Sequence, residues 1–318
     1  MFLESFRVTS LASAQIFILG AVGYFLVKKN ILSETGLNSI SRLVIELTLP
    51  ALIFCQLIKD FSFSLYPRWW AFPLLSIGVN FLGLAAGFLF CGLVRKGDFR
   101  LQFLSAVTFQ NSGYLPLALI AALIPQDKAG PMLVYLFLFL IGFNLTTWSL
   151  GVYMLTFTRA RRFALGSLFS PPVITAFLSL VIIFLGLNRF IPHTLIKPLR
   201  MIGDCTLPLA LLVVGGNLAA VRLKGADKKA VSLMVLAKLI ILPALALLFV
   251  VKFDLALSLG MLILIEFAMP PATSLSLIIR HYKKDDLFIS QAVFWGHILS
   301  LVSVPVFLSL YFAIKGMP

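Results

Sequence analysis

The chain has 318 residues, of which 60% are hydrophobic and only 12% are charged. Soluble domains carry about a quarter charged residues, so this composition excludes an ordinary soluble protein and indicates one built for a lipid bilayer. The formal net charge of +14 would suit nucleic acid, but the basic residues gather in alternate loops, and we expect no nucleic-acid partner.

Ten apolar stretches are long enough to cross a hydrocarbon core of about 30 Å as helices. Six of them contain no Asp, Glu, Lys or Arg: 8–27, 69–94, 101–126, 129–158, 163–188 and 287–314. Four carry one charge each: 43–58 (Glu46), 201–221 (Asp204), 230–251 (Lys238) and 255–279 (Glu266). The sequence therefore predicts an all-α integral membrane protein with ten transmembrane helices.

Lys and Arg divide unevenly between the two sides that successive loops would face. The loops after spans 1, 3, 5, 7 and 9 hold 16 of them, whereas the termini and the other loops hold 9. The positive-inside rule places the richer set in the cytoplasm. We therefore expect a multi-pass protein of the plasma (inner) membrane, with both termini outside the cytoplasm.

Two segments repeat one another at half the chain length. Residues 42–50 read RLVIELTLP and residues 200–208 read RMIGDCTLP, 158 residues further on. Five spans in each half force the two copies to lie upside down relative to each other. Inverted five-span repeats are typical of secondary transporters, whose substrate site lies near the midplane. We expect repeats over 1–158 and 171–318, joined by a short cytoplasmic linker, 159–170.

The fourth span contains an unusual stretch, FQNSGYLPLAL. Gly113 and Pro116 disfavour helix. Three polar neighbours, Gln110, Asn111 and Ser112, need hydrogen-bond partners that hydrocarbon cannot supply. The sequence therefore predicts a break in this helix.

The repeat predicts a second break in the ninth span, where residues 267–277 read FAMPPATSLSL. Pro270 and Pro271 are adjacent there, with Met269 and Thr273 beside them. Irregular backbone at membrane depth is tolerated where it is buried in protein or lines a wet cavity. The free N–H groups and partial positive charge of a half-helix end suit an anion. We expect the two breaks to face each other and bind a small anionic substrate.

Glu266 stands four residues before Pro270, at a depth where a charge costs roughly 2.5–3.5 kcal/mol and needs a partner or a proton. Three roles stay open for it. It carries a coupling H⁺, it binds a coupling Na⁺ together with Gln110 and freed carbonyls, or it pairs permanently with Lys238 of the neighbouring span.

Two further acids are spaced four residues after an arginine, as Arg42 with Glu46 and Arg200 with Asp204. Each pair can neutralise itself along one helix face, so we expect a structural role. A gate or proton site beside the substrate cavity is the alternative. His297, a lone imidazole in the tenth span, is expected to be a helix-packing group rather than a relay.

Several motifs are missing from the sequence. It contains no P-loop, no HExxH pair and no GxSxG elbow, which argues against ATP-driven transport and against an intramembrane hydrolase. We therefore expect a secondary carrier that is not an enzyme and uses no cofactor. A receptor that binds its ligand without transport is the alternative from another class, but the short loops count against it.

Four motifs resemble the auxin efflux carrier family: LTLPALIF, NSGYLPLAL, KLIILP and AMPPATSLSLIIRHY, in spans two, four, eight and nine. This family includes the plant PIN carriers and bacterial carriers of small carboxylates. The resemblance implies a scaffold of spans 1, 2, 6 and 7 and a mobile transport domain of spans 3–5 and 8–10, working as an elevator. It also implies that Asn111 binds the substrate carboxylate, and it leaves room for a homodimer through the scaffold. A Na⁺-coupled symporter like the bile acid carriers is the alternative with the same fold.

The charge distribution gives a direct test of orientation. Cysteines introduced into the 95–100 and 222–229 loops, in a variant without native cysteines, should resist an impermeant thiol reagent in intact cells. Both loops are expected to face the cytoplasm, so they should react after permeabilisation. Labelling of both loops in intact cells would contradict the orientation and the inverted repeat with it.

Overall fold

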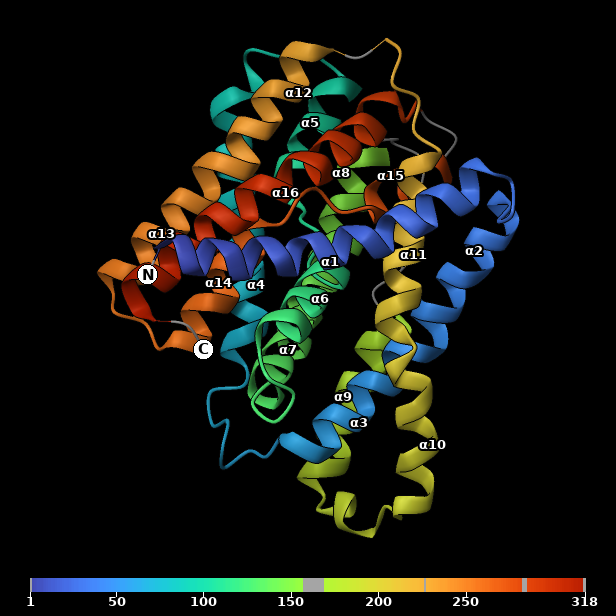
Figure 1. Ribbon diagram of the computed structural model, residues 1–318, viewed down its shortest axis with the longest axis vertical. Coiled ribbons are helices and arrows are strands. Elements are labelled where there is room, and N and C mark those ends of the chain that lie inside the picture. Colours follow the sequence, from blue (N-terminus) through green and yellow to red (C-terminus); the bar gives the residue numbers. More distant parts are fainter. Residues whose placement is uncertain (1, 157–168, 226, 282–284, 317–318) are drawn as a thin grey trace.

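The computed structural model describes residues 2–156, 169–225, 227–281 and 285–316, and their regular structure is helical throughout (Figure 1). Among these residues, seven helical stretches are long and apolar enough to cross a membrane: Phe2–Lys28, Glu34–Asp60, Ala71–Cys91, Gly130–Thr156, His193–Ala219, Lys228–Lys252 and Leu287–Lys315. The protein is therefore a multi-pass membrane protein. Most of the expected linker, 159–170, lies outside the described residues.

The described residues of the first half form eight α-helical segments. They are α1 (Phe2–Lys28), α2 (Glu34–Leu43), α3 (Leu49–Asp60), α4 (Ala71–Cys91), α5 (Asp98–Thr108), α6 (Tyr114–Leu123), α7 (Gly130–Thr146) and α8 (Val152–Thr156). Single π-helical segments, η1 (Val44–Thr48) and η2 (Thr147–Gly151), join α2 to α3 and α7 to α8.

The described part of the second half is also built of helical segments. It contains α9 (Pro171–Phe184), the 3₁₀ turn η4 (Leu187–Phe190), α10 (His193–Asp204), α11 (Thr206–Ala219), α12 (Lys228–Val235), the π-helical η5 (Leu236–Ile241), α13 (Leu242–Lys252), α14 (Leu257–Ala268), α15 (Ser274–His281) and α16 (Leu287–Lys315). Pro50 and Pro243 come just after η1 and η5. A proline inside a helix loses one backbone hydrogen bond and crowds the carbonyl four residues earlier, and the wider π turn accommodates this.

The centre of the molecule is formed by α7 and α14. Residues 136–143 of α7 and 260–268 of α14 are all buried, and all of them except Glu266 are apolar, which is the pattern of helices surrounded by other protein. Around them, α4 packs on α5 and α7, and α14 packs on α13 and α16. A second group of contacts joins α3 to α9 and α10. The central helices are therefore held on all sides by protein.

The first helix crosses the front of the molecule in Figure 1 and packs on α11 and α16. Its contact with α11 is backbone to backbone, because a Cβ added at Gly215 would overlap the carbonyl of Gly20. Small residues allow such close approach of membrane helices. Where α1 packs on α16, the hydroxyl oxygens of Thr9 and Ser309 lie 2.8 Å apart.

The close contact between α1 and α11 predicts that Gly215→Ala destabilises the protein. The added methyl group has no space, and overpacking of this kind costs about 1–3 kcal/mol, so thermal unfolding in detergent should begin at a lower temperature. Gly78→Ala in α4 is the matched control, because nothing lies within 4 Å of a Cβ there. Equal effects of both substitutions would show that the contact is looser than described.

Candidate functional site

Two helices stop inside the protein and restart after five residues. The first interruption lies between Thr108, the last residue of α5, and Tyr114, the first residue of α6. The second lies between Ala268 of α14 and Ser274 of α15. Both interruptions fall within the stretches that the sequence analysis predicts to be broken.

The two interruptions cross as a short antiparallel pair, with an isolated bridge between them. The backbone N–H of Asn111 donates to the carbonyl of Pro270 at 2.8 Å. The N–H of Ala272 donates to the carbonyl of Phe109 at 3.0 Å. Each break thereby supplies hydrogen-bond partners to the other, which hydrocarbon could not do.

A pocket lies beside this crossing. From the breaks and the helix starts that follow them it is lined by Gln110, Asn111, Ser112, Gly113, Tyr114, Ala272, Thr273 and Ser274. Its other walls are Ile45 and Leu49 near the start of α3, Leu140, Phe143, Asn144, Thr147 and Trp148 of α7 and η2, and Ser170 and Pro172 at the start of α9. Because their first residues line it, both α6 and α15 direct their N-terminal ends toward the pocket. Two such ends would together favour an anion.

An amine and a carboxylate are buried next to the crossing. Lys238 is 1% exposed and Glu266 is 0% exposed. The ammonium of Lys238 donates to Oε1 of Gln110 at 3.3 Å. The carboxylate of Glu266 interacts electrostatically with Lys238 and is directed toward Gln110 and Ser112, yet neither of its oxygens has a partner with hydrogen-bond geometry among the described residues. Gln110 therefore stands between two opposite charges that do not form a contact ion pair.

Comparison with known proteins identifies the family of this chain. A family model described as "Membrane transport protein" matches residues 8–163 and 155–308, nearly the whole chain. The protein belongs to this family, the auxin efflux carriers. The resemblance carried by the four motifs is thus confirmed, and the carrier is a membrane transporter and not an enzyme.

Proteins of a plant and of an archaeon are similar to this chain. The carrier is 22% identical to Protein PIN-LIKES 1 of Arabidopsis thaliana, over 96% of its own chain and 79% of the relative. It is also 22% identical to Protein PIN-LIKES 7 of the same plant, over 98% and 99% of the two chains. An uncharacterized transporter of Methanocaldococcus jannaschii is 26% identical over 66% of this chain and 68% of the relative.

Five of the nine residues that the sequence analysis proposes as substrate contacts line the pocket of the carrier: Gln110, Asn111, Ser112, Gly113 and Thr273. The other four do not. Met269, Pro270 and Pro271 belong to the second break, where they shape the crossing instead.

Pro116 has a different role from the one that its sequence position suggested. It lies in the first turn of α6, where a backbone N–H has no intrahelical partner in any case, so proline is tolerated there. The interruption itself covers 109–113, before Pro116 is reached. Pro116 therefore belongs to the start of the second half-helix rather than to the break.

The two predicted acid–base pairs form, but away from the crossing. Nε of Arg42 lies 3.1 Å from Oε1 of Glu46, and Nε of Arg200 lies 4.0 Å from Oδ1 of Asp204. The side chains of Glu46 and Asp204 are 53% and 62% exposed, and neither lines the pocket. Each pair neutralises itself along one helix face, as the spacing indicated. Asp204 also lines a separate polar cavity between α3, α6 and α10.

Sequence reasoning did not place four residues in this region, three from the fifth span and one from α16. Asn144, Thr147 and Trp148 bring polar groups from the fifth span, and the run NLTTWS within an otherwise apolar stretch was the available signal. His297 of α16 is fully buried, and its Nε2 lies 3.3 Å from Nδ2 of Asn111. No local pattern placed His297 there.

The arrangement of Lys238 and Glu266 predicts strong energetic coupling between them. Lys238→Met should leave the carboxylate of Glu266 buried without a countercharge, and loss of one partner of a buried pair costs about 3–5 kcal/mol. The midpoint of thermal unfolding in detergent should therefore fall sharply. The double substitution with Glu266→Gln should recover most of the loss, because neither charge remains.

The exposed Glu46→Gln is the control, since pairs at such positions contribute only about 0–1 kcal/mol. If the double variant loses as much as the two single variants combined, Lys238 and Glu266 act independently, and the coupling is refuted.

Proposed function

We propose that the carrier is a secondary active transporter that moves a small organic anion across the plasma membrane. The observation that carries this proposal is the pocket on which the N-terminal ends of α6 and α15 converge, beside the amide of Asn111. Helix N-termini favour a carboxylate without a full countercharge. The substrate class is a mono- or dicarboxylate, and an auxin-like acid falls within it.

We propose further that ten spans form two inverted repeats, 1–158 and 171–318, with both termini outside the cytoplasm. The seven long stretches, α9 and the two interrupted helices would supply the ten spans. The first break lies between Thr108 and Tyr114, and the second lies between Ala268 and Ser274. The two residues that flank the second break therefore follow the two that flank the first by the same number of residues. Antiparallel pairing of the two breaks agrees with copies of opposite orientation.

Transport would proceed by an elevator-type displacement. In this proposal α1, α2–α3, α9 and α10–α11 form the scaffold, and the remaining helices form the transport domain. The packing of α3 on α9 and α10, and of α4 on α5 and α7, supports this grouping. Most of the polar wall of the pocket belongs to the transport domain, whereas Ile45, Leu49, Ser170 and Pro172 come from the scaffold. Movement of the domain would carry the anion along a largely apolar wall. A homodimer would form through the scaffold, which stays in place.

The proposal predicts a specific loss in Asn111→Ala. One donor to the carboxylate disappears, and a hydrogen bond to a charged group contributes roughly 1.5–3 kcal/mol, so affinity should fall about ten- to a hundredfold. Isothermal titration of purified protein with malate, malonate, lactate and an indole acid would measure it. Asn38→Ala, on the exposed side of α2, is the control and should bind as the unmodified protein does. Unchanged affinity in Asn111→Ala would place the substrate site elsewhere.

A Na⁺-coupled symporter is the second candidate. The two unpartnered carboxylate oxygens of Glu266 and the nearby amide of Gln110 favour it, because oxygen atoms are the ligands of hard cations. The ammonium of Lys238 on Gln110 opposes it, since a second cation there would be repelled.

Reconstituted protein with H⁺ and Na⁺ gradients imposed separately distinguishes these mechanisms. We expect carboxylate uptake to be independent of Na⁺. Uptake that follows a Na⁺ gradient at fixed pH would establish the symporter instead. Carboxylate binding without any flux into sealed liposomes would point to a receptor.

A further inference from the structure

His297 is a buried titratable side chain in direct contact with Asn111. It lies on α16, one residue after Gly296, where a Cβ would be only 2.5 Å from Cδ of Pro271. The absence of a side chain at Gly296 allows α16 to approach the crossing closely. The imidazole thereby reaches the amide that the proposed function assigns to the substrate carboxylate.

The hydrogen bonds of His297 fix the orientation of that amide. Nδ1 lies 2.8 Å from the carbonyl oxygen of Val293, and a carbonyl can only accept, so Nδ1 carries a hydrogen. In a neutral imidazole Nε2 is then a bare acceptor, and Nδ2 of Asn111 donates to it. One N–H of the amide is occupied by the imidazole, so only the second N–H remains to donate to an anion. Oδ1 is the end of the amide directed away from the imidazole, and an oxygen beside a bound carboxylate repels it.

We propose that a proton and the anion bind together, with the proton on Nε2 of His297 and the anion at Asn111. This proposal rests on the proposed function and adds the coupling ion to it. A protonated Nε2 is a donor and can no longer accept from Nδ2. The amide of Asn111 turns over, Oδ1 accepts from Nε2–H, and the NH₂ group donates to the carboxylate. The proton comes from the water of the compartment that delivers the substrate.

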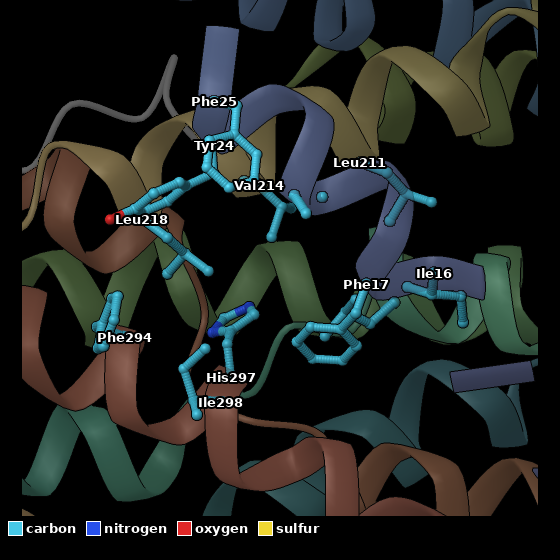
Figure 2. A pocket seen from close by; sticks show the side chains of 14 residues that line it. Ile16, Phe17, Tyr24, Phe25, Leu211, Val214, Leu218, Phe294, His297 and Ile298 are labelled. Atoms are coloured by element: carbon cyan, nitrogen blue, oxygen red, sulfur yellow. The ribbon is translucent and has the colours of Figure 1, made fainter. Parts of the chain in front are cut away.

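The surroundings of His297 make each partner depend on the other. Figure 2 shows the imidazole rising from α16 into a pocket among Phe17, Val214, Leu218 and Phe294. This pocket is formed by α1, α6, α11 and α16 and is almost entirely apolar. A protonated imidazole without an anion is therefore an isolated charge in an apolar site, which is costly.

The other titratable groups nearby do not compensate this charge. Tyr24 of α1 lines the same pocket and Tyr114 begins α6, whereas α11 contains no titratable residue. Lys238 and Glu266 interact with Gln110 and with each other rather than with the imidazole. The anion is then the partner of the proton, and by linkage each raises the affinity for the other by the same factor.

The number of protons taken up per bound anion distinguishes a histidine that carries the proton from one with a purely structural role. Titration of the purified carrier with lactate and with indole-3-acetate at about pH 7, in buffers of different ionisation enthalpy, gives the protons taken up per anion. These acids are already ionised there, so any proton taken up goes to the protein. We expect uptake of one proton by the unmodified carrier and none by His297→Gln. His193→Gln, which changes an exposed imidazole on α10, is the matched control and should keep the uptake.

A second measurement needs no variant at all. If one proton accompanies the anion, affinity of the unmodified carrier should fall about tenfold for each pH unit of rise, once the pH is high enough for the free imidazole to be neutral. Affinity that does not change with pH, or proton uptake that persists in a folded His297→Gln protein, would overturn this inference and leave the proposed function standing. Failure of all four carboxylates of the binding panel to bind at any pH would overturn both.

Discussion

The interaction on which the structure depends is the pair of backbone hydrogen bonds between the two helix breaks. Each break frees N–H and C=O groups in an interior that offers little else to bind, and an unmade backbone hydrogen bond there costs several kcal/mol. Asn111 and Ala272 donate across the crossing, so neither break is stable without the other. Their pairing also sets the positions of Tyr114 and Ser274, where the two half-helices restart. The helix ends that face the pocket are thus a consequence of the backbone requirement itself.

The same crossing organises the buried charges. Lys238 and Glu266 come from different helices, and each would be expensive in this interior alone. The antiparallel bridge to Pro271 holds Gln110 in place. Oε1 of Gln110 accepts a hydrogen bond from the ammonium of Lys238, and the side chain faces the carboxylate of Glu266. A side chain fixed by the break therefore joins two charges that would otherwise be separate. Stability of the interior and geometry of the candidate site rest on the same residues.

Local patterns in the sequence predicted the break positions, because Gly113 and the prolines 270 and 271 interrupt long apolar runs that have no other reason to be interrupted. They also predicted the two exposed acid–base pairs, whose i, i+4 spacing is a property of one helix. They did not predict His297 at Asn111, since that contact depends on how closely α16 approaches Pro271 at Gly296. Pro116 was a misleading sign of the break, because a proline is tolerated in the first turn of a helix. The break ends before Pro116, which lies in the first turn of α6. Contacts between distant helices follow from packing, which no single stretch of sequence encodes.

The charge balance of the proposed cycle is satisfied when the proton on His297 and the anion arrive together. Protonating Glu266 without an anion would leave Lys238 as an uncompensated buried cation, because Lys238 has no other carboxylate among its described contacts. If Lys238 and Glu266 instead keep opposite charges throughout, their sum stays at zero. The empty domain then holds a neutral imidazole, and the domain loaded with a monocarboxylate holds an imidazolium beside an anion. In both forms the charges buried at the site sum to zero. A domain that must move its site through a low-dielectric membrane in both directions meets the smallest electrostatic barrier when that site carries no net charge in either form.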